Sequence, residues 1–317
     1  MVPAYGTAPT ALERSVEDYL TSCRARGLSL ATLSNSYGFP LRHVFLPWAA
    51  RESLATPSQV TGRSLERLAV ELLDVGGRRG PLSRHSVHTY LRAVNQFLKW
   101  AKAEGEAVAD NARVALPSRP RSLPEVLSRE QIEAMEGAAV SERDRLIVRL
   151  LADTGMRVGE LVGLRTGDLL TRTRGAYLRL RGKGGRERQV PLMPRLAHRV
   201  ERYLRQTRPK DSGSNRLFLG LRRSRETGGY EPLTPSGVQQ LVRGLGQRSG
   251  IPQRVHPHLF RHSFVTWALA QGMNPVQLAD IVGHTSLTMI QQVYSHLSPN
   301  DAYDAMARVL MARDQPS

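Results

Sequence analysis

The stretch from Arg254 to His296 carries start and stop signals for short helices, and these signals limit the fold more than any other feature of the chain. Pro257 suits the first turn of a helix, because its missing N–H would be unbonded there in any case. Gly272 suits the position just past a helix end, where a left-handed backbone is common. We therefore predict a helix over about 257–270.

The same punctuation is repeated further along the stretch. Asn274 and Pro275 form a second start signal, and Gly283 forms a second stop signal. Ser286 can cap a third helix, which would carry apolar residues at helical spacing. The stretch is thus predicted to fold as three short helices joined by tight turns.

Four polar side chains are predicted to converge on these turns. His258 and Arg261 are three positions apart, so they share one helix face. His284 directly follows the terminating Gly283, on a turn that can point into a cleft, and Tyr294 lies near the end of the third helix.

This set of residue types suits the cleavage of a phosphodiester. An Arg guanidinium offers a planar fork of donors to the non-bridging oxygens, a Tyr hydroxyl can act as nucleophile, and a His can move protons. The pattern H-x-x-R, then G-H, then Y near the C-terminus resembles the tyrosine site-specific recombinases, the family of phage integrases and of the Xer chromosome-dimer resolvases.

A second motif upstream carries the same resemblance. In ADTGMRVGELVGL, Gly155 ends one helix and Arg157 begins the next, with Glu160 one turn on, so that the helix dipole also favours an anion beside Arg157. Taken alone, this is an ordinary surface Arg beside a helix cap. However, T-G-M-R-x-x-E-L is similar to the first arginine box of the family. The resemblance implies that Arg157 binds the scissile phosphate and that Glu160 orients Arg157 or a histidine.

A glycine-rich hairpin lies between the two boxes. The alternating runs 177–181 and 187–192 are joined by GKGGR, with Lys183 at the tip. The loop lacks the spacing of a Walker phosphate loop. By itself it is a flexible turn with a solvated charge. The family places a mobile lysine on this hairpin, which implies that Lys183 donates a proton to the leaving oxygen.

The resemblance implies metal-independent phosphoryl transfer on double-stranded DNA, with no cofactor. Tyr294 would form a 3′-phosphotyrosyl link, and Arg157 and Arg261 would hold the two non-bridging oxygens in place of divalent cations. His258 would accept or relay the tyrosyl proton, and His284 would bind a phosphate oxygen. The family acts as a tetramer on two DNA sites, so a homo- or hetero-tetramer is expected.

Six residues match the family in order and together form the predicted catalytic set: Arg157, Lys183, His258, Arg261, His284 and Tyr294. One departure concerns the last two. His284 and Tyr294 are ten positions apart, one more than in the family pattern. One extra residue in a helix rotates the later residues by about 100°. Tyr303 is the only other tyrosine downstream and lies too far on, so Tyr294 is retained.

Composition agrees with a polyanionic partner. The 317 residues include 45 Lys and Arg against 28 Asp and Glu, a formal net charge of +17 that is spread along the chain. The competing interpretation is an Arg-rich solvated surface that reflects a GC-rich coding bias. Cys23 is the only cysteine, no run approaches the roughly 20 apolar residues of a membrane helix, and the N-terminus lacks signal-peptide features. A cytoplasmic protein is expected.

The first part of the chain is predicted to be a four-helix domain. Apolar spacing marks helices over about 11–27, 30–50, 64–75 and 83–105, with Gly38, Pro40 and Pro47 breaking the second. The last of these helices has an apolar stripe and an opposite basic face, which is the first candidate for DNA contact. That face consists of Arg84, His85, His88, Arg92 and Lys99.

The segment LPSRPRSLPE reads as an extended basic linker. It divides the chain into a helical core DNA-binding domain at 1–118, a linker at 119–124 and a catalytic domain at 125–317. The predicted fold is mainly α in two domains, with a SAM-like N-terminal domain and a C-terminal α-rich domain that contains a small antiparallel sheet. In the second domain we predict helices from Ser128 and over 143–152, 195–208 and 235–247, and a tail helix that docks on its own domain or on a neighbouring protomer.

Three other interpretations compete with this one. His256, His258 and His262 have spacing that can bind zinc, but Arg261 would sit beside the cation and no Glu lies between the histidines. No metal is therefore expected, and His262 is predicted to pack against the core. A type IB topoisomerase and a catalytically silent DNA-binding regulator stay open as alternatives to the recombinase. Whether a recombinase of this kind resolves chromosomes or moves a mobile element also stays open.

Overall fold

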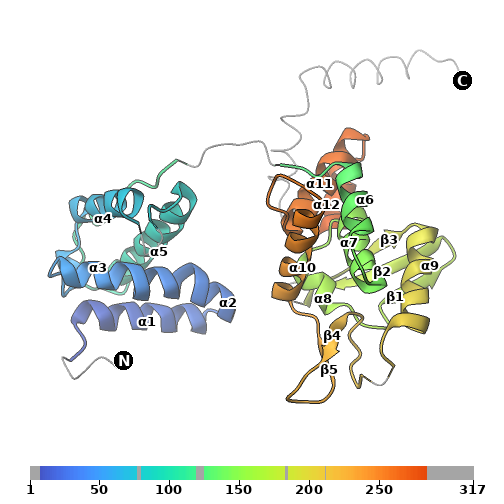
Figure 1. Cartoon of the computed structure of the whole chain (residues 1–317). Coiled ribbons are helices and arrows are strands. Elements are labelled where there is room, and N and C mark those ends of the chain that lie inside the picture. Colours follow the sequence, from blue (N-terminus) through green and yellow to red (C-terminus); the bar gives the residue numbers. More distant parts are fainter. Residues whose placement is uncertain (1–7, 77–79, 119–124, 183–184, 211, 284–317) are drawn as a thin grey trace, which may run out of the picture. The chain divides into compact units, whose positions relative to one another are not determined.

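The computed structural model describes residues 8–76, 80–118, 125–182, 185–210 and 212–283. It divides the chain into two compact units, Met1–Ser122 and Leu123–Ser317, each with its own hydrophobic core (Figure 1). The units are mainly helical with small antiparallel sheets, so the predicted fold class is confirmed.

The first unit contains four helical stretches, as predicted. They are α1 (Ala11–Ala25), a composite helix over residues 30–51, α4 (Gly62–Asp74) and α5 (Arg84–Ala103). Hydroxyl side chains cap all four at the N-terminus: Thr10, Ser29, Thr61 and Ser83 accept backbone N–H groups at the starts of α1, the composite helix, α4 and α5. Their apolar faces meet in one core, to which α5 contributes Val87, Leu91, Val94, Phe97, Leu98 and Ala101.

The prediction that Gly38, Pro40 and Pro47 break the second helix is wrong. The chain stays helical from α2 (Leu30–Thr32) through π-helical turns at Leu33–Gly38 and Leu41–Phe45 to α3 (Leu46–Arg51). The Phe39 N–H bonds to the Ser34 carbonyl and the Leu46 N–H to the Leu41 carbonyl, each five residues back. These wider turns accommodate a proline, which has no N–H and would crowd the carbonyl four residues back.

The second unit is built around a buried helix. Helix α7 (Glu142–Thr154) packs against α6 (Arg129–Gly137), α8 (Val158–Gly163), α9 (Pro194–Arg202) and α11 (Pro257–Ala270). Its core side chains are Leu146, Ile147, Val148, Leu150 and Leu151. Because α7 is buried on several sides, the turn at its C-terminus is firmly placed relative to α11.

A three-stranded antiparallel sheet covers part of this core. Its order is β1 (Leu169–Arg172), β2 (Gly175–Arg181) and β3 (Glu187–Leu192). The predicted hairpin of β2 and β3 is confirmed, with Arg181 paired to Glu187 and Leu180 paired to Arg188. Strand β1 and a two-stranded sheet of β4 (Leu219–Arg223) and β5 (Tyr230–Pro232) were not predicted.

The helices predicted from Ser128 and over 143–152, 195–208 and 235–247 are present, whereas the predicted tail helix lies outside the described residues. Ser128 caps α6, and α9 continues into a π-helical turn at Tyr203–Thr207. Helix α10 (Pro235–Arg248) precedes α11, and α12 (Pro275–Val282) begins at the Asn274 cap and ends at Gly283 with φ +66°. Helix α12 packs on α11 through an apolar cluster that includes Val265, Leu269, Leu278 and Val282, and it also contacts β3. The bounds predicted for α11 and α12 are therefore confirmed, whereas the third helix of that stretch lies outside the described residues.

Candidate active site

Arg157 is placed by the turn between α7 and α8. Gly155 ends α7 with φ +58°, and a Cβ there would come within 2.6 Å of the Phe264 ring, so this turn requires glycine. Arg157 is the N-cap residue of α8, and the Glu160 carboxylate accepts its backbone N–H at 2.8 Å. The same carboxylate accepts Nη1 of Arg157 at 3.2 Å. Glu160 thus holds both the backbone and the side chain of Arg157, while 40% of the Arg157 side chain stays exposed.

Arg261 lies on α11 and is only 3% exposed. Its Nη1 donates to the Gly155 carbonyl at 2.8 Å, and its Nη2 donates to the Val282 carbonyl at 2.6 Å. Burial, with the nearby charge of Arg157, lowers the pKa of Arg261 to about 9. The guanidinium is thus still charged at neutral pH, and it joins the end of α7 to the end of α12.

Arg188, on β3, belongs to the same cluster and was not predicted. Its Nη1 and Nη2 donate to the two carboxylate oxygens of Glu160 at 2.5 and 2.8 Å, a bidentate pair. Its Nε donates to the Ile281 carbonyl at 2.8 Å. The sequence did contain a signal, because residue 188 alternates with the buried Val190 and Leu192 and so takes an inward position of the strand.

Three arginines therefore hold the end of α12. Arg188 binds the carbonyl of Ile281, Arg261 that of Val282, and Arg157 that of Gly283, the last at 2.8 Å. These are three successive carbonyls at a helix C-terminus, where intrahelical partners run out. The cluster brings together both predicted arginine boxes at the residue that directly precedes His284.

His258 lies in the first turn of α11, behind the N-cap residue His256. Partial burial of the ring lowers the pKa of His258. The charges of His256, Arg261 and Arg157 lower this pKa further. A histidine with a lowered pKa is neutral near pH 7, as a proton acceptor must be.

Three of the predicted catalytic residues, Lys183, His284 and Tyr294, lie outside the described residues. The strand residues on either side of Lys183 are described. The last described pair of the β2–β3 hairpin is Arg181 with Glu187. A Cβ on Gly182 would lie 3.9 Å from Oε1 of Glu160, so the end of strand β2 lies beside the cluster.

The histidines that suggested a zinc site have other surroundings. Nδ1 of His256 accepts the Leu259 N–H at 3.2 Å as the cap of α11. His262 is half-buried, in agreement with its predicted packing, and burial lowers its pKa. Within the described ranges, no three His, Cys, Asp or Glu side chains gather as metal ligands would.

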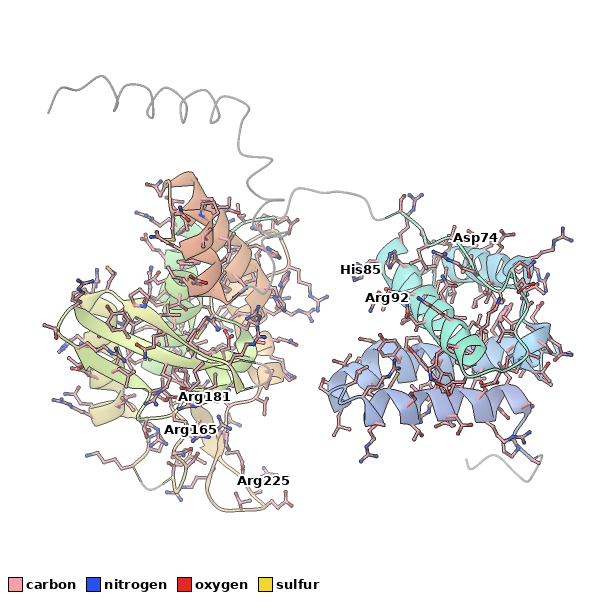
Figure 2. The ribbon with its side chains drawn as sticks, turned by 180° about the vertical axis from the view of Figure 1, so that it is seen from behind. Asp74, His85, Arg92, Arg165, Arg181 and Arg225 are labelled. Atoms are coloured by element: carbon pink, nitrogen blue, oxygen red, sulfur yellow. The ribbon has the colours of Figure 1, made fainter. Side chains whose placement is uncertain are left out.

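The basic face of α5 is largely accessible. Arg84, His85, Arg92 and Lys99 are exposed, and His88 is half-buried; Figure 2 shows His85 and Arg92 on this helix. Figure 2 also labels exposed Arg165 and Arg225 in the second unit, the latter between β4 and β5. The α5 face therefore remains a candidate for DNA contact, and its role is a prediction.

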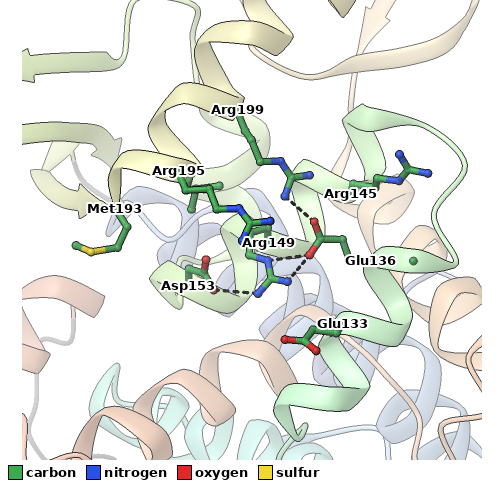
Figure 3. Close-up of a pocket in the computed structure, with 10 residues that line it drawn as sticks. Glu133, Glu136, Arg145, Arg149, Asp153, Met193, Arg195 and Arg199 are labelled. Carbon is green, nitrogen blue, oxygen red and sulfur yellow. Dashed lines mark hydrogen bonds and ion pairs between the residues drawn. The ribbon is translucent and has the colours of Figure 1, made fainter.

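A pocket of about 590 Å³ lies between α6, α7 and α9, away from the predicted residues (Figure 3). Glu136 pairs there with Arg149 and Arg199, and Asp153 lies 3.7 Å from Arg149. Burial raises the pKa of Asp153. These charges largely satisfy one another, and the ion pairs of Glu136 link α6 to α7 and α9. In the part of the chain that the structure describes, no helix is both long and apolar enough to span a membrane.

Known proteins share both the sequence pattern and the fold. The model of the phage integrase family matches residues 125–301. The tyrosine recombinase XerD of Mycobacterium tuberculosis is 32% identical over 290 residues, which cover 86% of this chain and 89% of the relative. XerA of Pyrococcus horikoshii is 32% identical over 232 residues, covering 73% and 76%.

Solved structures agree on the fold. A XerH site-specific recombinase bound to its difH substrate has a TM-score of 0.69 at 20% identity, covering 92% of this chain and 83% of that one. Lambda integrase bound to DNA has a TM-score of 0.66 at 18% identity, covering 87% and 93%.

The family match spans more than half of the chain, and the arginine boxes that it includes form one cluster. This chain belongs to the phage integrase family. It is a tyrosine recombinase that carries out site-specific DNA recombination, and these relatives favour neither a type IB topoisomerase nor a silent regulator.

Proposed function

We propose that residues 125–317 form a catalytic domain in which Arg157 and Arg261 hold the non-bridging oxygens of one scissile phosphate. One observation carries this proposal. Two guanidiniums that are far apart in the sequence meet at the end of α12, on the carbonyls of Gly283 and Val282. Arg157 is accessible and Arg261 is buried close to it, so both guanidinium charges act on a phosphate bound at this point.

The reaction then proceeds by transesterification. The Tyr294 phenol oxygen attacks the phosphorus and forms a 3′-phosphotyrosyl bond, while the bond from phosphorus to the 5′-oxygen breaks. The phenol proton passes to His258, and Lys183 supplies a proton to the leaving 5′-oxygen. His284 binds a phosphate oxygen. A 5′-hydroxyl from a partner duplex reverses the step, because the covalent link conserves the energy of the broken bond.

The partner is double-stranded DNA, and four copies of the chain act on two sites. The net charge of +17 and the exposed basic face of α5 support a DNA partner, as do relatives whose structures contain DNA. Residues 1–118 form the core DNA-binding domain, and residues 119–124 form the linker. We place the reaction in the cytoplasm, on a chromosome or a mobile element.

Substitution of the predicted nucleophile tests the proposal. Fragmented DNA from the host is incubated with the protein, and covalent complexes are isolated under denaturing conditions and sequenced. Tyr294→Phe is expected to bind the recovered duplex as wild type does but to form no covalent complex. Tyr303→Phe is the matched control, because it removes the only other tyrosine after Tyr294 and should leave complex formation unchanged.

Two results would contradict the proposal. Covalent complexes formed by Tyr294→Phe at the wild-type rate would remove Tyr294 as the nucleophile. Loss of cleavage in EDTA with recovery on adding zinc would favour the histidine metal site instead.

A further inference from the structure

We infer that Arg188 is a positioning residue of the reaction. It pairs with Glu160 and holds the end of α12, so that the segment leading to His284 starts from a fixed point. The inference rests on the roles proposed above for Arg157 and Arg261. Arg188 itself is not placed on the substrate.

All three nitrogens of the Arg188 guanidinium donate hydrogen bonds, to two different partners. Two nitrogens grip both oxygens of Glu160, and the third donates to the Ile281 carbonyl. Only 15% of the Arg188 side chain and 4% of the Glu160 side chain are exposed. A lysine has no planar fork and cannot make this set of contacts.

The local charge balance explains why a second arginine is needed on Glu160. Glu160 orients Arg157 through two hydrogen bonds, but its negative charge also offsets that of Arg157. Arg188 neutralises the carboxylate, so the positive charges of Arg157 and Arg261 remain available to a phosphate. Stabilisation by such fixed charges is strong in a site that excludes water.

Gly283 has no side chain, and this leaves room for the guanidinium of Arg188. A Cβ at Gly283 would lie 2.8 Å from Nη1 and 2.9 Å from Cζ of Arg188. The guanidinium therefore lies against the bare backbone at the end of α12. This close approach ties β3 to the turn before His284, and any shift of Arg188 is passed to that turn.

The test compares Arg188→Gln with Arg186→Gln. Arg186 is exposed on the same hairpin, so the control removes the same charge without touching Glu160. The rate of covalent complex formation is measured on the recovered duplex, and hydrogen exchange is measured over residues 275–283. Arg188→Gln is expected to slow complex formation about 10- to 100-fold and to speed exchange, while its DNA binding weakens no more than that of Arg186→Gln.

Two further variants separate positioning from a loss of folding. Arg188→Lys keeps the charge, and we expect it to fold as wild type does, with faster exchange at 275–283 and a rate between those of wild type and Arg188→Gln. In Glu160→Gln/Arg188→Gln the carboxylate that Arg188 neutralises is gone. Its rate should fall by less than the product of the two single losses.

Several outcomes would overturn the inference. One is a wild-type rate of complex formation with wild-type hydrogen exchange in Arg188→Gln or in Arg188→Lys. Another is a double variant whose loss of rate equals the product of the losses in the two single variants. If wild type itself forms no covalent complex, the proposed function fails. The exchange of residues 275–283 still reports on Arg188 in that case, so the two failures are distinguishable.

Discussion

Arg261 donates to the Gly155 carbonyl at 2.8 Å, which bonds the second arginine box directly to the turn that carries the first. A second bond to Val282 at 2.6 Å extends the link to α12. A single buried side chain thus sets the relative position of three segments. Burial of this cation costs free energy, and it therefore lowers the pKa of Arg261 to about 9.

Arg261→Lys should therefore impair both catalysis and stability. One ammonium cannot reach both carbonyls and a phosphate, so complex formation should slow on the order of 10²- to 10³-fold. A buried carbonyl without a partner should lower the free energy of unfolding by about 1–3 kcal/mol. Urea unfolding and the rate of complex formation measure the two effects. Arg254→Lys, at an exposed position before α11, is the control, and equal losses in both variants would contradict the prediction.

Gly283 and Gly272 offer a matched pair of substitutions. Both have a left-handed backbone, with φ +66° and +81°, so alanine should cost about 1–2 kcal/mol of unfolding free energy at either position. Only at Gly283 would the new Cβ meet a side chain, that of Arg188; at Gly272 nothing described lies within 4 Å. Gly283→Ala should therefore lose about 1–3 kcal/mol more and slow complex formation, whereas Gly272→Ala should retain the rate. Equal losses of stability in denaturant titrations would refute this.

The pH dependence of the reaction should report His258. Burial and nearby positive charges lower its pKa below the ordinary 6.5. It then accepts a proton at neutral pH, and complex formation should fall only as the pH drops below 6.5, through the lowered pKa. Stability should fall in the same window, because the unfolded chain binds the proton at higher pH than the folded one does.

Rate profiles between about pH 5 and 8 test this assignment. His258→Gln should be about 10²- to 10⁴-fold slower and should lack the acid limb. His262→Gln, four residues on along α11, should keep it. An acid limb that persists unchanged in His258→Gln would assign it to another group.

The basic face of α5 should appear in the salt dependence of DNA binding. Each phosphate contact contributes about 0.9 to the slope of log affinity against log salt. Arg92→Gln should lower that slope by about this amount if Arg92 contacts a phosphate. Arg24→Gln removes a charge that is also exposed, on α1, and should change the slope less. Identical slopes for the two variants would remove α5 as the contact face.

The bounds of α11 and α12 were predictable because their signals are local. Pro257 and Pro275 fix helix starts, and Gly283 fixes a left-handed end, whatever the rest of the fold does. The composite helix over 30–51 shows the limit of such reasoning. A proline is a strong local breaker, but packing kept the chain helical there by widening two turns.

The cluster around Glu160 was only partly predictable. The order of motifs identified Arg157 and Arg261, and helical spacing paired Arg157 with Glu160. Arg188 was missed because its partners come from other segments, α8 and α12, and only tertiary packing brings them together. A charged residue at an inward position of an alternating strand is the signal that would have found it.

Lys183 can be tested through the leaving group that it is predicted to protonate. A thiol has a pKa of about 8.5 and leaves without an acid, unlike the 5′-alcohol of ordinary DNA. Lys183→Ala should slow complex formation about 10²- to 10⁴-fold on ordinary DNA but should approach the wild-type rate on DNA with sulfur at the bridging 5′ position. Lys210→Ala, at an exposed site in the same unit, should match wild type on both substrates. If Lys183→Ala were equally slow on both, its role would lie in binding or positioning, because a proton donor is dispensable only when the leaving group needs no proton.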